Sequence, residues 1–167
     1  MVPDSVDAVT SDHGWDLETD GARLRPIVQA LQAEGIRVSL FLDPVEDQVY
    51  RARDLGADRI ELYTEPFAVA FAAGDASNEL ERFARAGALA GSIGLGVNAG
   101  HDLNAENVGL FCSAVPNVLE VSIGHALVGR ALDIGLDGAI AELAAALPHA
   151  NRLRRSCSRF TMGTEGL

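Results

Sequence analysis

Segments with continuous apolar runs alternate along the chain with segments whose apolar residues lie three or four positions apart. This pattern predicts alternating strands and helices. Runs of β-branched and apolar residues predict strands at 36–42, 59–64, 95–99 and 118–123. Apolar residues three or four positions apart predict helices at 21–34, 44–55, 77–93, 104–114, 126–133 and 136–147. Residues 65–76 are expected to form a polar loop. Asp43, Pro44 and Glu46 are expected to cap and open the second helix.

The strict alternation of strand and helix requires a parallel sheet, because each helix returns the chain to the same end of the sheet. The carboxyl ends of the strands therefore share one rim, where α/β proteins bind ligands and carry out chemistry. The side chains expected at this rim are Asp43, Glu61, Tyr63, Thr64, His101 and His125. Alternation places Ile60 and Leu62 on the helix-facing side of their strand.

Composition limits the organisation and the partners of the chain. A length of 167 residues with 48% hydrophobic content suffices for one buried domain. A formal net charge of −11 argues against nucleic-acid and anionic membrane surfaces as partners. No apolar run approaches the roughly 18 residues of a membrane span, and the N-terminus lacks the basic start of a signal peptide. We therefore expect a cytoplasmic protein with no nucleic-acid and no membrane partner.

The types of basic residue and the spacing of the cysteines exclude several catalytic mechanisms. All 13 basic residues are arginine, which excludes lysine Schiff-base chemistry and a Walker-A lysine within this chain. Cys112 and Cys157 stand in neither a metal-binding nor a redox spacing. Arginines cluster in residues 151–167, which we expect to be a disordered basic tail without a role of its own.

Two stretches, residues 95–101 and 119–125, share one layout in which an apolar run ends in Gly-His and a helical pattern follows. His101 is a candidate for proton transfer, because imidazole groups exchange protons near neutral pH. Gly100 before it is expected to let the backbone turn sharply. Gly124 and His125 precede a predicted helix, whose N-terminal N–H groups form an anion site. The alternatives are a structural histidine bonded to a carbonyl group and a plain strand-to-helix turn.

The remaining candidate groups are two carboxylates, and a metal site is considered beside them. Glu61 faces the same side of its strand as Tyr63, so it is a candidate for acid–base work or for binding a cationic group, or else it pairs with an arginine. Glu120 is expected to be mostly structural. We expect no metal site, because no His-x-His or His-Glu-x-x-His spacing is present. Zinc or iron remains a rival interpretation for a set of four residues: Glu61, His101, Asp102 and His125.

Four motifs have the order and spacing of a known family: residues 38–43, 60–64, 96–104 and 123–131. Together they resemble the pyridoxine 5'-phosphate synthases, the ring-closing enzymes of vitamin B6 biosynthesis, over residues 2–147. The resemblance implies a (β/α)8 TIM barrel that condenses 1-deoxy-D-xylulose 5-phosphate with 3-amino-2-oxopropyl phosphate. It also implies that the products are pyridoxine 5'-phosphate, inorganic phosphate and water, and that no metal or organic cofactor takes part.

The resemblance assigns roles to individual residues. His101 is similar in position to the proton donor of the family, and Glu61 to the acid that stabilises the transition state. Asp102 replaces a glycine found in some family members. The residues that match substrate-binding positions of the family are Thr10, Asp102, Gly124 and His125.

The resemblance covers the C-terminal portion of the family pattern, so residues 1–150 are expected to form four of the eight βα units, an incomplete half-barrel. A complete barrel typically needs about 250 residues. A second histidine, arginines and a glutamate of the family have no counterpart in this sequence. We expect the chain to be inactive alone, and to associate with itself as a homo-oligomer or with a missing N-terminal half. The alternative is a non-catalytic phosphate-binding or interaction half-barrel.

Overall fold

Apolar segments within residues 1–148, the part that the computed structural model describes, form four strands. They are β1 (Ser39–Leu42), β2 (Arg59–Tyr63), β3 (Gly96–Gly100) and β4 (Val118–Ser122). The four form one sheet in the order β1-β2-β3-β4, and every neighbouring pair is parallel. The predicted α/β fold with a parallel sheet is therefore confirmed. The predicted tail at 151–167 lies outside the described residues.

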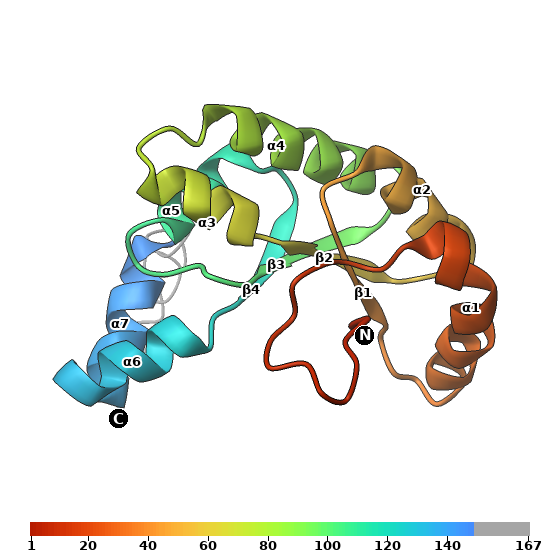
Figure 1. Ribbon diagram of the computed structural model, residues 1–167, viewed down its shortest axis with the longest axis horizontal. Coiled ribbons are helices and arrows are strands. Elements are labelled where there is room, and N and C mark those ends of the chain that lie inside the picture. The colour runs from red at the N-terminus through yellow and green to blue at the C-terminus, as the bar shows by residue number, and fades with distance from the viewer. Residues whose placement is uncertain (149–167) are drawn as a thin grey trace, which may run out of the picture.

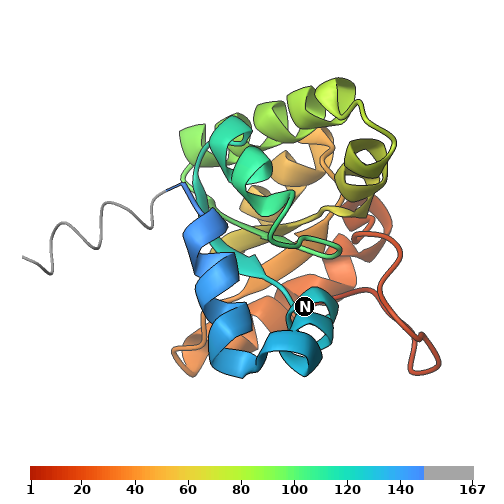
Figure 2. The same cartoon turned by 90° about the vertical axis from the view of Figure 1, so that its left-hand side faces the viewer.

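The helices follow the strands in the predicted alternation. Their bounds are α1 (Leu17–Ala33), α2 (Glu46–Leu55), α3 (Glu65–Ala72), α4 (Ser77–Ser92), α5 (Val108–Ala114), α6 (His125–Ile134) and α7 (Leu136–Ala146). Helices α1, α2, α4, α5 and α7 form an arc around the sheet, and each contacts the next (Figure 1). Helices α6 and α7 lie at the end of this arc that follows β4 (Figure 2). No helix of the described part has both the length and the apolar character that a membrane crossing requires.

The helix-facing side of the sheet forms the hydrophobic core. The side chains without solvent exposure on this side include Leu40, Leu42, Ile60 and Leu62. The prediction that alternation turns Ile60 and Leu62 toward the helices is therefore confirmed. The core continues between the helices, where the ring of Phe111 lies 5.1 Å from that of Phe67 and 5.2 Å from that of Phe83.

The other side of the sheet is polar near the amino ends of its strands. Arg59 of β2 donates to the Asn98 side chain of β3 at 2.9 Å and pairs with Glu120 of β4 at 2.9 Å. Arg37, just before β1, pairs with the same Glu120 at 3.2 Å. Since a residue beside the first strand contacts the fourth, the sheet must curve toward this side. Glu120 thus pairs with two arginines, and its structural role stays a prediction.

Residues 65–72 form helix α3, where a polar loop was predicted. Pro66 lies in the first turn of this helix, where the missing N–H group of proline costs nothing. Phe67 is fully buried against Phe111. Tertiary packing stabilises this short helix, because eight residues are too few to be helical alone.

The predicted cap of α2 is wrong. The helix begins after Val45, whose side chain cannot cap it. Asp43 instead accepts a hydrogen bond from the N–H of Gly14 at 3.1 Å and so holds the segment before α1 against the end of β1. A tertiary contact has therefore replaced the local one.

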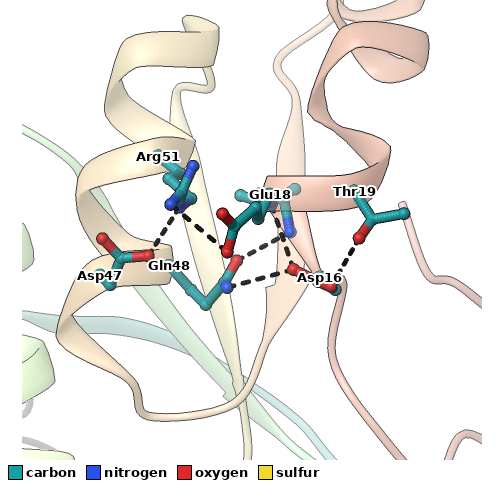
Figure 3. A network of polar contacts seen from close by, with 7 residues as sticks. Asp16, Glu18, Thr19, Asp47, Gln48 and Arg51 are labelled. Carbon is teal, nitrogen blue, oxygen red and sulfur yellow. Dashed lines mark hydrogen bonds and ion pairs between the residues drawn. The ribbon is translucent and has the colours of Figure 1, made fainter.

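Helix α1 begins earlier than predicted, at Leu17, because Asp16 accepts a hydrogen bond from the N–H of Glu18 at 3.1 Å and caps the first turn. A polar network joins this end of α1 to α2 (Figure 3). In it Gln48 accepts a hydrogen bond from the N–H of Leu17 at 2.8 Å, and Arg51 pairs with Glu18 at 3.6 Å. The two helices are thus aligned at their amino ends.

Asp58 holds the residues just before β1 in place by hydrogen bonds. Its carboxylate accepts hydrogen bonds from the N–H of Val38 at 2.8 Å and from the Gln32 amide at 3.0 Å, and these bonds hold the pKa of the Asp58 carboxyl below its usual range. We predict that Asp58→Ala lowers the free energy of unfolding by about 1 kcal/mol at neutral pH. A lowered folded pKa stabilises the protein above the unfolded pKa, so the difference should shrink as the pH falls through the folded pKa.

Denaturant unfolding of both proteins at neutral and at acidic pH measures this difference. Asp75→Ala is the comparison variant. Asp75 is exposed just before α4, and the hydrogen bond from the N–H of Ser77 is the main cause of its lowered pKa. A stability difference for Asp58→Ala that stays constant with pH would contradict the assigned role.

Candidate active site

A cavity of about 740 Å³ opens at the carboxyl ends of β2, β3 and β4, beside the first turn of α6. Parallel connections bring these ends to one rim. Five of the six residues proposed from the sequence line this cavity, namely Glu61, His101, Asp102, Gly124 and His125. The structure thus brings two imidazoles and a carboxylate from three different strand ends into one space.

Thr10 does not join them. It lies in the exposed segment before α1 and lines a different hollow of about 540 Å³. In the same segment the His13 imidazole is hydrogen-bonded to the Asp12 carboxylate, which raises the pKa of His13. This segment leaves the sheet beside β1, at the far edge from α6 (Figure 1).

Glu61 reaches across β3 because Gly100 has no side chain. A Cβ atom at Gly100 would lie 2.3 Å from the Glu61 Oε1 atom. Glu120, a second carboxylate within the strands on this side of the sheet, is paired with two arginines. Within residues 1–148, Glu61 has neither an ion pair nor a hydrogen bond, so its carboxylate is available to a bound molecule.

We predict that Gly100→Ala displaces the Glu61 carboxylate without unfolding the protein. The atom that must move is the end of a flexible side chain, and the backbone of Gly100 does not have a positive φ. The next contact, with the Ser122 Cβ atom at 3.2 Å, requires only a small shift. A crystal structure of the variant would show the displacement. Gly129→Ala is the matched control, because nothing lies within 4 Å of a Cβ atom there. An unmoved Glu61 in a folded Gly100→Ala protein would contradict the interpretation.

The sharp turn at the end of β3 is made by His101 and Asp102. Their φ angles are +83° and +57°, in the left-handed region that non-glycine residues seldom adopt. The prediction that Gly100 makes this turn is therefore wrong, and that glycine makes room for Glu61 instead. Two adjacent strained residues at a cavity rim indicate a conformation that the surrounding structure imposes.

Helix α6 begins at His125, directly after its N-cap residue Gly124. No side chain of residues 1–148 caps this helix, so the N–H groups of its first turn are open beside the cavity in the described part of the chain. The helix dipole adds positive potential at the same place. In a chain without lysine, these backbone groups form a site for a phosphate group or another anion.

Other titratable groups contribute less to this cavity. Within residues 1–148, no three His, Cys, Asp or Glu side chains lie close enough together to hold a metal ion. Cys112 lies outside the cavity lining, and burial raises the pKa of its thiol.

Two polar lining residues escaped the sequence analysis. Ser122 faces the cavity because it lies two positions after Glu120 on β4, and the same alternation could have identified it. Asn104 was predicted to begin a helix, but α5 starts at Val108. Asn104 instead closes a turn by accepting hydrogen bonds from the N–H groups of Glu106 at 2.9 Å and Asn107 at 3.1 Å.

Comparison with known proteins finds relatives along almost the whole described chain. The family model of pyridoxal phosphate biosynthesis protein PdxJ matches residues 1–149. The pyridoxine 5'-phosphate synthases of Albidiferax ferrireducens and Xanthomonas axonopodis pv. citri are 50% and 51% identical over 140 residues, which are 84% of this chain. These residues are 56% and 55% of the two relatives, so the chain spans about half the length of the curated relatives it matches.

A solved structure supports the fold independently. The BexX/CysO complex of Amycolatopsis orientalis is similar with a TM-score of 0.50 and 18% sequence identity. The similarity covers 89% of this chain and 55% of that chain. At this identity the likeness concerns the fold alone.

Proposed function

The chain belongs to the PdxJ family of pyridoxal phosphate biosynthesis proteins, and we propose that it carries part of the active site of a pyridoxine 5'-phosphate synthase. The reaction would condense 1-deoxy-D-xylulose 5-phosphate with 3-amino-2-oxopropyl phosphate to pyridoxine 5'-phosphate, inorganic phosphate and water. The observation that carries the proposal is one cavity shared by the Glu61 carboxylate, the His101 imidazole and the uncapped start of α6.

Each of these groups suits a step of the reaction. His101 would donate a proton to the reacting substrate, and the unpaired Glu61 carboxylate would stabilise positive charge in the transition state. The phosphate of the amino ketone would bind the N–H groups at Gly124 and His125, with Asp102 at the same rim. Thr10 lies outside this cavity, so its segment would contact substrate only across the mouth of a completed barrel. The proposed reaction uses no metal and no organic cofactor.

We also propose that residues 1–150 are four consecutive βα units of a (β/α)8 barrel. The four described strands are parallel, follow each other in sequence order and curve toward the polar side, as consecutive strands of a barrel do. The chain spans about half of its synthase relatives. Catalytic groups that this chain lacks would come from the other units, so the 167-residue chain alone would have little or no activity.

The edge of β4 supports association with another polypeptide. No strand of residues 1–148 pairs with its outer side. Beside this edge lies a groove of about 240 Å³, whose lining within the described part of the chain is apolar: Val121, Ile123, Leu127, Ile140, Leu143, Ala144 and Leu147. A further parallel strand would satisfy the backbone groups of β4 and cover this groove. The partner would be a second copy or a polypeptide that supplies the other half of the barrel.

Complementation tests the function directly. The purified chain is assayed alone, and after co-expression with the part of the Albidiferax ferrireducens synthase that it does not match, here called the complemented enzyme. Calorimetry with 3-amino-2-oxopropyl phosphate measures binding in both preparations, and inorganic phosphate tests competition at the α6 site. We expect binding in both preparations and turnover in the complemented enzyme only.

The other outcomes are equally informative. Turnover by the chain alone would overturn the proposed inactivity. Binding in both preparations without any turnover would favour a phosphate-binding half-barrel over an enzyme. Absence of both binding and turnover from a folded complex would overturn the proposed function.

A further inference from the structure

We propose that the rings of Phe41 and Tyr63 are positioning groups that hold the His101 imidazole in one orientation at the cavity rim. This inference rests on the proposed function, in which His101 is the proton donor. It explains why two large aromatic side chains, only 2% and 5% exposed, occupy the side of the sheet that otherwise carries polar groups.

The backbone of His101 is held first. Thr64, which is fully buried just after β2, shares its one hydroxyl proton between the carbonyl oxygen of Gly100, at 2.8 Å, and that of His101. The N–H of Thr64 also bonds to the Gly100 carbonyl, at 2.9 Å. The buried Asn107 side chain donates to the carbonyl oxygen of Asp102 at 3.1 Å. These bonds hold two adjacent residues in the left-handed conformation and thereby set the direction of the His101 side chain.

The imidazole is held next. Its centroid lies 5.1 Å from the Phe41 ring, at an interplanar angle of 56°, and 5.4 Å from the Tyr63 ring, at 75°. The Phe41 and Tyr63 rings are themselves 5.4 Å apart. The three rings therefore contact one another pairwise, in the tilted and edge-on arrangements that aromatic groups favour. Rings from β1, β2 and the end of β3 thus meet at one point of the rim.

Tyr63 is also fixed at its far end. Its hydroxyl donates to the Glu65 carboxylate at 2.5 Å, in the first turn of α3. Burial, followed by this hydrogen bond, raises the pKa of the Tyr63 phenol, so the hydroxyl keeps its proton and remains a donor. Helix α3 thereby contributes to the site although it does not line the cavity.

Fixed orientation matters for a proton donor. Proton transfer requires the imidazole nitrogen within hydrogen-bond reach of the reacting atom, and a misplacement of about 1 Å can cost on the order of 10²-fold in rate. A histidine side chain at an open rim would otherwise populate several rotamers. The two rings restrict it to the orientation in which it faces the cavity.

Nuclear magnetic resonance of the 167-residue chain, with labelled histidine, tests this arrangement without any need for turnover. In the unsubstituted chain we expect nuclear Overhauser contacts from the His101 ring protons to both aromatic rings, and upfield ring-current shifts of those protons. This first measurement does not depend on whether a variant folds. Absence of these contacts in the folded chain would overturn the proposal.

Variants then separate the ring from the hydroxyl. Phe41→Leu and Tyr63→Leu should each reduce the ring-current shift of His101, whereas Tyr63→Phe should keep it. Phe71→Leu is the matched control, because Phe71 contacts Phe67 and no ring of this cluster. In the complemented enzyme, Tyr63→Leu should lower kcat about 10²-fold with little change in KM, and Tyr63→Phe should restore most of the loss. Unchanged kcat in Tyr63→Leu would contradict a positioning role.

These readouts distinguish the two proposals. Intact ring contacts in a complemented enzyme that neither binds nor converts substrate would overturn the proposed function and leave the ring arrangement standing. Normal turnover with a freely rotating His101 ring would overturn the positioning role alone.

Discussion

Replacing Glu61 with glutamine is expected to lower kcat of the complemented enzyme by about 10² to 10⁴-fold. Glutamine keeps the shape of the side chain and removes its charge, so the cavity remains and the stabilisation of the transition state is lost. Glu61 has no ion-pair partner in residues 1–148 whose loss would disturb the fold. Steady-state kinetics with both phosphorylated substrates measure the effect, and denaturant unfolding of the same sample shows whether stability is unchanged.

Glu81→Gln provides the matched control. Glu81 lies on α4 with an exposed side chain, and among the described residues its one ion-pair partner is Arg85 at the surface. The same chemical change there should leave kcat unaltered, because surface ion pairs contribute little. If Glu61→Gln kept kcat within a factor of about three, a value below the range for a general acid or base, Glu61 would have no part in catalysis.

Replacing Phe111 with alanine is expected to lower the free energy of unfolding by about 3–5 kcal/mol. Its ring is fully buried between Phe67 and Phe83 and joins helices α3, α4 and α5. Truncation leaves a cavity where three helices meet. The packed helices can relax only partly toward one another, so the cavity stays open. A loss of this size is a large fraction of the usual stability of a domain, so much of the variant should be unfolded near physiological temperature.

Urea unfolding followed by circular dichroism measures this loss. Leu132→Ala is the control, because Leu132 of α6 is 85% exposed and its truncation should change stability by no more than about 0.5 kcal/mol. A loss below about 1 kcal/mol for Phe111→Ala would be outside the range of a fully buried ring. The contacts of Phe111 with Phe67 and Phe83 would then not be the main packing between these helices.

The elements that the sequence predicted correctly are those with a strong local period. Alternation in β2 identified Ile60 and Leu62 as helix-facing, and the run of strand and helix units required a parallel sheet. From the sheet alone it followed that Glu61, His101 and His125 share a rim, because parallel connections place all carboxyl ends together.

Three of the failures of prediction come from contacts between distant parts of the chain. Asp43 caps no helix of residues 1–148, and its carboxylate instead accepts a hydrogen bond from the N–H of Gly14, far away in sequence. Helix α3 forms where a loop was predicted because Phe67 packs against Phe111 of α5. The role of Gly100 depends on Glu61, which reaches it from the neighbouring strand.

The sequence by itself determined the order of the elements, the direction of the strands and the rim at which candidate groups gather, since these follow from residue spacing and from the chirality of short connections. Only the tertiary structure decided which of two carboxylates stays unpaired, which residue takes the left-handed turn and which rings hold His101. Each of these depends on side chains from separate strands meeting at a distance of a few ångströms. Local propensity contains no information about such meetings, and for His101 it even disfavours the conformation that the structure imposes.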